Sequence, residues 1–186
     1  MMSLRLLTVA ASGAVAVLVV AVACGEGGSN ALYSFAQPWG ASKTVDPIGH
    51  VWSAGGIPLC TKGDSPVTIT SITPIAIHGQ INLSRIAIRR VQSNSTIGTY
   101  PVLPPGSKQP GGYVIPSPSP CRWPADTDPF YETVIAASRT GARGGYIKDL
   151  RVRYRTGSVR GAYLIAFTYA LCGRHGPAPA LTGCPA

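Results

Sequence analysis

Acidic residues are scarce in this chain of 186 residues. Asp and Glu number seven against sixteen Lys and Arg, which gives a formal net charge of +9 at pH 7. Paired carboxylates for general acid–base catalysis are therefore hard to assemble. The closest pair, Asp126 and Asp128, precedes Pro129 in a stretch that is typical of a solvated loop. The charge balance favours anionic partners.

Catalytic and metal-binding motifs are also missing. The chain has three histidines and no Cys-x-x-Cys, so a zinc site or a thioredoxin-like redox motif finds no support. There is no G-x-S-x-G, Walker or H-E-x-x-H pattern. Asp64-Ser65 superficially resembles a serine-protease nucleophile, but Pro66 replaces the glycine that shapes the oxyanion turn. We therefore expect no catalytic, cofactor or metal site from motifs.

The N-terminus contains one long apolar run. Arg5 precedes seventeen uncharged residues, Leu6 to Val22, which predict a signal peptide over residues 1–23. The junction before Cys24 resembles a bacterial lipobox, although Ala21 departs from the preferred leucine. This resemblance implies a lipid on Cys24, and residues 24–30 read as a flexible tether. Ordinary secretory cleavage and an uncleaved anchor are the alternatives.

Alternation of apolar and polar residues is the main signal downstream. It predicts β-strands at Val67–Ile72, Ile81–Arg90, Glu132–Ser138, Tyr146–Arg155 and Ala162–Leu171. No amphipathic helix follows the leader. About 163 residues suffice for one domain, so we predict a single extracytoplasmic all-β domain over residues 31–186. The fold class is a small disulfide-stapled β-sandwich, immunoglobulin-like, or an open barrel.

Two segments lack such alternation. Residues 31–59 show no sustained period, and we assign no elements there. Residues 101–124 contain eight prolines and are predicted to be a loop, because proline has no amide hydrogen for a β-ladder. This loop is either a stiff connector that crosses between sheets or a docking segment for an aromatic groove.

Five cysteines are odd for a secreted chain, but a lipid on Cys24 leaves four that can form two disulfides. Residues 163, 165, 167, 169 and 171 share one face of the last predicted strand, which places Cys172 on the opposite face. A disulfide from Cys172 must therefore lie at a sheet end. One pairing joins Cys60 to Cys172 and Cys121 to Cys184. The alternative joins Cys60 to Cys121 and Cys172 to Cys184.

The strand sequences carry a family resemblance. Leu59-Cys60 before Val67-Thr68-Ile69, then residues 150–154, and finally 165–167 with Leu171-Cys172, resemble uncharacterised actinobacterial secreted proteins and lipoproteins. The likeness spans residues 59–173 and implies the fold without an activity. Twelve arginines against four lysines, with abundant Ala, Gly and Pro, are typical of a GC-rich genome.

Arginine is the most distinctive candidate for binding. Arg151, Arg153 and Arg155 alternate with apolar residues, so their side chains project from one strand face. We predict that Arg85 and Arg89 join them in an anion-binding face, with Arg139, Arg143, Lys148 and Arg160 adding charge. Such a face suits an anionic envelope polymer, lipid headgroups or an acidic protein. A merely solvated sheet face is the competing interpretation.

These patterns lead to one main functional hypothesis. We expect a non-enzymatic protein, lipid-anchored on the extracytoplasmic face of the cell membrane, whose β domain is a binding module. Nucleic acid is not an expected partner, because no recognition helix or RNP-type aromatic motif is present. The alternatives are an enzyme acting on envelope material and a purely structural cell-wall component.

Overall fold

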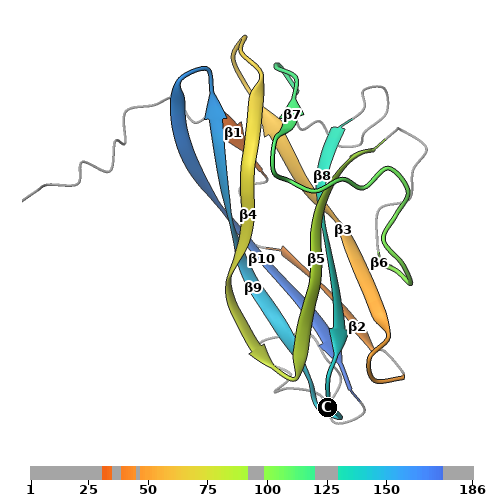
Figure 1. The fold of residues 1–186 in the computed structure, drawn as a ribbon. Helices are drawn as coiled ribbons and strands as arrows, with labels where there is room; N and C mark the ends of the chain where they lie inside the picture. Colours follow the sequence, from red (N-terminus) through yellow and green to blue (C-terminus); the bar gives the residue numbers. More distant parts are fainter. Residues whose placement is uncertain (1–30, 35–38, 45–46, 92–98, 120–129, 174–186) are drawn as a thin grey trace, which may run out of the picture.

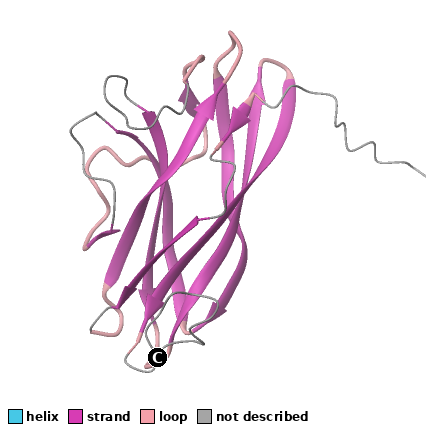
Figure 2. Ribbon diagram, turned by 180° about the vertical axis from the view of Figure 1, so that it is seen from behind, coloured by secondary structure: helices cyan, strands magenta, loops and turns pink. Residues whose placement is uncertain are grey.

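The computed structural model describes residues 31–34, 39–44, 47–91, 99–119 and 130–173, and this part of the chain contains ten strands and no helix (Figures 1 and 2). The strands form two sheets that pack face to face. The first sheet contains β1 (Leu32–Tyr33), β3 (Val51–Thr61), β8 (Phe130–Arg139) and β5 (Ile81–Val91), in this order, with β6 (Thr99–Tyr100) also paired to β3. The second has the order β2 (Trp39–Thr44), β10 (Val159–Cys172), β9 (Gly144–Thr156), β4 (Val67–Gly79) and β7 (Tyr113–Ile115). The prediction of an all-β sandwich is confirmed.

β10 shows how alternation produces the core. Ile165, Phe167, Tyr169 and Leu171 are buried between the sheets, as predicted, and Tyr163 packs against them. The pairing of β10 with β9 shifts register between Ile165 and Thr168. Asp149 has a φ of 52° opposite this bulge, and its Oδ1 accepts a hydrogen bond of 3.3 Å from the Phe167 amide. The bulge keeps Ile147 and Leu150, three residues apart, on the core side.

β3 and β8 lie inside the first sheet and are buried on both faces. Every residue of β3 from Ser53 to Thr61 is buried, and so is every residue of β8 after Phe130. A strand covered on both sides does not need to alternate. This explains why residues 51–61 gave no recognisable period in the sequence.

The proline-rich segment supplies the cover over the first sheet. We call residues 99–119 the strap. It begins as β6 on one edge of β3, and the Lys108 amide and carbonyl then form two hydrogen bonds of 2.8 Å with Ile88 on β5. Because β3 and β5 flank β8, residues 101–107 pass across the outer face of the sheet (Figure 1). The strap continues as β7 on the second sheet and returns to Thr61 through Ser119, which makes it a connector between the sheets.

Candidate functional site

The second sheet has a row of cations along the outward face of β9. Arg151, Arg153 and Arg155 are exposed, whereas the intervening Val152 and Tyr154 are buried. Beyond the bulge, Lys148 continues the row on the exposed side, and at the other end Arg160 of β10 lies directly opposite Arg155. We call these five residues, Lys148, Arg151, Arg153, Arg155 and Arg160, the basic track. The prediction that the three alternating arginines share an exposed face is confirmed.

The residues that flank the three arginines on β4 and β10 are uncharged. On β4, Thr68, Ser71 and Thr73 lie opposite Arg155, Arg153 and Arg151. On β10, Ala162 and Leu164 lie opposite Arg153 and Arg151. Apart from the Arg155–Arg160 pair, the positive charge is therefore one strand wide.

No acidic side chain compensates the basic track within the described part of the chain. The salt bridge found there joins Arg89 to Glu132 on the other sheet, and Asp149 accepts a hydrogen bond from the Phe167 amide. Neighbouring arginines on β9 stand about 6.6 Å apart along the strand. At that separation two unit charges repel by about 0.6 kcal/mol in water, before screening by salt. This cost is small enough for the row to persist, and an anion bound along it would remove the repulsion.

Arg85 and Arg89 do not belong to this face, which corrects the prediction of a five-arginine surface. Both lie on β5, in the first sheet. Arg85 is exposed there, but Arg89 is only 7% exposed and pairs with Glu132. Arg139 is buried as well, because its Nη1 donates hydrogen bonds to the carbonyls of Gly141 and Ala142 at 2.8 and 3.1 Å. Both arginines are buried and bonded within the fold, so neither is exposed to a ligand.

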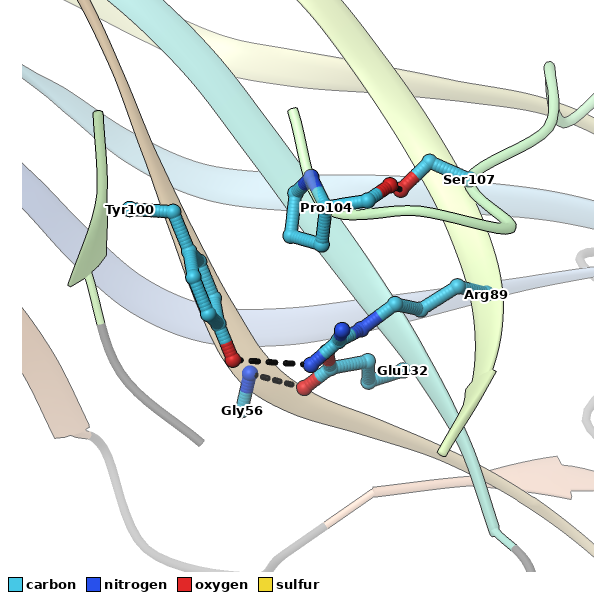
Figure 3. A network of polar contacts seen from close by, with 6 residues as sticks. All are labelled: Gly56, Arg89, Tyr100, Pro104, Ser107 and Glu132. Atoms are coloured by element: carbon cyan, nitrogen blue, oxygen red, sulfur yellow. Dashed lines mark hydrogen bonds and ion pairs between the residues drawn. The ribbon is translucent and has the colours of Figure 1, made fainter. Parts of the chain in front are cut away.

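Arg89 and Glu132 form the centre of a buried polar network under the strap (Figure 3). Arg89 Nε lies 2.5 Å from Glu132 Oε1, and the Gly56 amide donates a hydrogen bond to Glu132 Oε2. Arg89 Nη2 is 2.8 Å from the Tyr100 hydroxyl oxygen, and the guanidinium also lies 5.1 Å from the centre of the Tyr100 ring. Tyr100 belongs to the strap, so the network connects the strap to β5, β8 and β3.

Glu132 is enclosed in this network and has no exposed surface. Burial raises the pKa of Glu132, while the hydrogen bond and charge of Arg89 and the Gly56 amide oppose the rise. With both oxygens engaged and no contact with solvent, the carboxylate acts as an anchor for the strap. Sequence reasoning placed Glu132 in a strand but missed this role. The available signal was an acid at the start of an otherwise uncharged run, 133–138.

Two aromatic rings stack at the Lys148 end of the basic track. His78 of β4 lies opposite Tyr146 of β9, with ring centres 4.7 Å apart and an interplanar angle of 28°. His78 is exposed, and Tyr146 is half-buried against Ala170 and Cys172. The described residues contain no group of three or more potential metal ligands. They also contain no helix able to span a bilayer.

The described cysteines lie far apart. Cys60 and Cys172 are both buried, at 0% and 1% exposure. Leu59, next to Cys60, pairs with Tyr131 at one end of β8. Cys172 pairs with Gly144, which follows the turn at the other end of β8. Eight residues of β8 separate Tyr131 from Arg139, or about 26 Å, whereas a disulfide requires Cα atoms within about 7 Å. The fold thus rules out the Cys60–Cys172 pairing.

The remaining predicted sites fall outside the described residues. These are Cys24, the signal peptide and tether, Cys121, Cys184, and residues 120–124 of the proline-rich segment.

Comparison with known proteins identifies no family for this chain. No protein-family model matches the chain, and no curated protein matches it. A solved structure of a family 123 glycoside hydrolase from Clostridium perfringens, described in terms of glycolipid glycan hydrolysis, is similar over 77% of this chain. The TM-score is 0.38 and the identity 12%, and the match spans 24% of the hydrolase. We draw no functional argument from this likeness.

Proposed function

We propose that this protein is an envelope-associated binding module that recognises anionic material through the basic track. The observation that supports the proposal is the exposed row of five cations, which no described acid compensates. A row of guanidinium groups attracts phosphate, sulfate or carboxylate groups by charge and by directed hydrogen bonds. The strap keeps the opposite sheet covered, so the second sheet is the one that offers a charged open face.

The test is the loss of binding when the charge of the basic track is removed. The triple variant R151S/R153S/R155S should lose binding to phosphatidylglycerol vesicles and to dextran sulfate, and the residual binding should depend less on salt. A matched control, R85S/R90S/R143S, removes three exposed arginines outside the basic track. If both triple variants lose binding equally, net charge alone accounts for it and the proposal fails.

We further propose that Cys24 carries a lipid that holds the domain at the extracytoplasmic face of the membrane. This rests on the lipobox-like residues before Cys24 and the apolar run from Leu6 to Val22. Mass spectrometry of the mature N-terminus should show a chain that begins at Cys24 and carries acyl mass. C24S should release the domain from the membrane fraction. A native chain that retains Met1 would contradict this proposal.

The cysteine positions favour the second of the two predicted pairings, Cys60 with Cys121 and Cys172 with Cys184. Ser119 pairs with Thr61, next to Cys60, and Cys121 follows two residues later in the sequence. Cys172 lies at the opposite end of the sandwich, and Cys184 is then the remaining cysteine with which it can pair. Peptide mapping without reduction should recover these two cross-linked pairs. Recovery of a peptide linking Cys60 to Cys172 would refute the assignment and the strand register behind it.

A further inference from the structure

The shape of the basic track carries information about its ligand. Four of its cations, Lys148, Arg151, Arg153 and Arg155, lie in single file on β9. Seven residues of extended chain separate the first from the last, which corresponds to about 23 Å. Charge drawn out over such a length and confined to the width of one strand matches a chain-like anion better than a broad surface.

The flanks of the row add a second observation. The β4 side carries the hydroxyls of Thr68, Ser71 and Thr73, one strand spacing of about 4.8 Å from the arginines. Hydroxyl groups can both donate and accept hydrogen bonds, which suits a ligand that itself carries hydroxyls. The β10 side carries the short Ala162 and the exposed Leu164, so nothing charged competes with the row there.

The end of the row adds a third observation. Beyond Lys148, the stacked His78–Tyr146 pair presents His78 to solvent. Tyr146 lies on β9, two residues before Lys148, and His78 lies opposite it on β4. The aromatic pair therefore continues the line of the cations. A flat ring exposed beside cations offers an apolar surface on which the face of a sugar ring can rest.

From these three observations we propose that the basic track binds one extended, sugar-based polyanion that lies along β9. Its charged groups contact Lys148 and the three arginines, its hydroxyls meet those of β4, and a sugar ring rests on His78. This inference depends on the proposed function, because it specifies the ligand of the same face. A flat anionic membrane would contact the whole sheet face, but only the single row of cations on β9 would attract it, because the residues on both sides of the row are uncharged.

The experiment compares three probes with the intact domain: dextran sulfate fractions of graded length, inorganic polyphosphate and phosphatidylglycerol vesicles. Affinity for dextran sulfate should rise with length until the chain spans about 30 Å, the length of β9 from Tyr146, opposite His78, to Arg155, and then level off. If the counterion release measured for single-stranded nucleic acids applies, four contacts give a log–log salt slope of about −3, and each single Arg→Ser substitution on β9 reduces its magnitude by about 0.7.

The variant H78A separates the sugar contact from the charge contacts. It should weaken dextran sulfate binding several-fold and leave polyphosphate binding, which involves no sugar ring, unchanged. Equal effects on both probes would remove the sugar from the proposal. Binding to vesicles without binding to either polymer would overturn this inference while the proposed anion-binding function stands. Absence of binding to all three probes would overturn both.

Discussion

Removal of Arg89 should expose the energetic role of the buried ion pair. R89M replaces the guanidinium with an apolar side chain and leaves Glu132 buried, with Gly56 as its remaining hydrogen-bond donor. Deleting one partner of a buried ion pair typically costs about 3–5 kcal/mol of unfolding free energy. We expect a loss of this size near pH 8, because the carboxylate is then charged in a site that excludes water.

The loss should depend on pH with a definite sign. Burial already raises the pKa of Glu132 in the native protein, and without Arg89 the opposing contribution disappears. A carboxyl whose folded-state pKa is raised stabilises the fold below its unfolded pKa, and this stabilisation is lost as pH rises through the folded-state value. R89M should therefore recover much of its stability as the pH falls towards about 4, near the pKa of an exposed glutamate.

The double variant R89M/E132Q is the matched control, because it has the same cavity and no carboxylate. Urea unfolding followed by tryptophan fluorescence gives the free energy of unfolding of each variant. We expect the double variant to be more stable than R89M at pH 8 and nearly equal to it at pH 4. A difference between the two that stays constant over this pH range would refute the reasoning.

Two further substitutions test the packing. Tyr169 is fully buried, and its hydroxyl has no hydrogen-bond partner in the structure, so Y169F should raise the free energy of unfolding by about 1 kcal/mol. Burial also raises the pKa of Tyr169, so the free energy of unfolding should fall as pH rises above about 10. Y169F should reduce this fall in alkaline urea titrations. A destabilised Y169F would contradict both expectations. A Cβ on Gly55 would lie 2.7 Å from Glu132 Oε1, whereas one on Gly111 would lie 3.8 Å from its nearest neighbour. G55A should therefore cost about 1–3 kcal/mol and G111A almost nothing, and equal midpoints in thermal unfolding would show that Glu132 is not held in place.

Most strands that sequence analysis located have one face towards solvent, and β8, which is buried on both faces, is the exception. β4 and β10 alternate because one side packs on the core and the other meets solvent, and this pattern is visible residue by residue. β3 is also covered on both faces, and because Gly55, Gly56 and Pro58 interrupt it, its sequence shows neither alternation nor a continuous apolar run. The strap covers its outer face from 38 residues or more further along the sequence, and no local pattern encodes that contact.

In the candidate site, too, sequence could predict what depends on a single strand and could not predict what depends on contacts between distant strands. The exposure of Arg151, Arg153 and Arg155 follows from alternation within a single strand, so sequence alone could predict it. The fate of Arg89 depends on the register of β5 against β8, which sets Arg89 opposite Glu132. A lone glutamate beside an apolar run signals a buried partner, but several arginines could have provided it. Assignment to Arg89 needed the bulge between Leu83 and Arg85, which shifts that register.

The few acidic residues bear on both sheets, because those described on β8 and β9 bond within the fold and leave the basic track uncompensated. Glu132 is the acid that the fold buries, and it neutralises Arg89 under the strap rather than a cation of the basic track. Asp149, the acid nearest to the track in sequence, accepts a backbone hydrogen bond at the bulge. Both described acids on β8 and β9 thus serve the architecture, and the charge of the track stays available for an external anion. The substitution T73E places an acid on β4 opposite Arg151. It should form a cross-strand pair that stabilises the fold by a few tenths of a kcal/mol. It should also weaken dextran sulfate binding more than T73Q does.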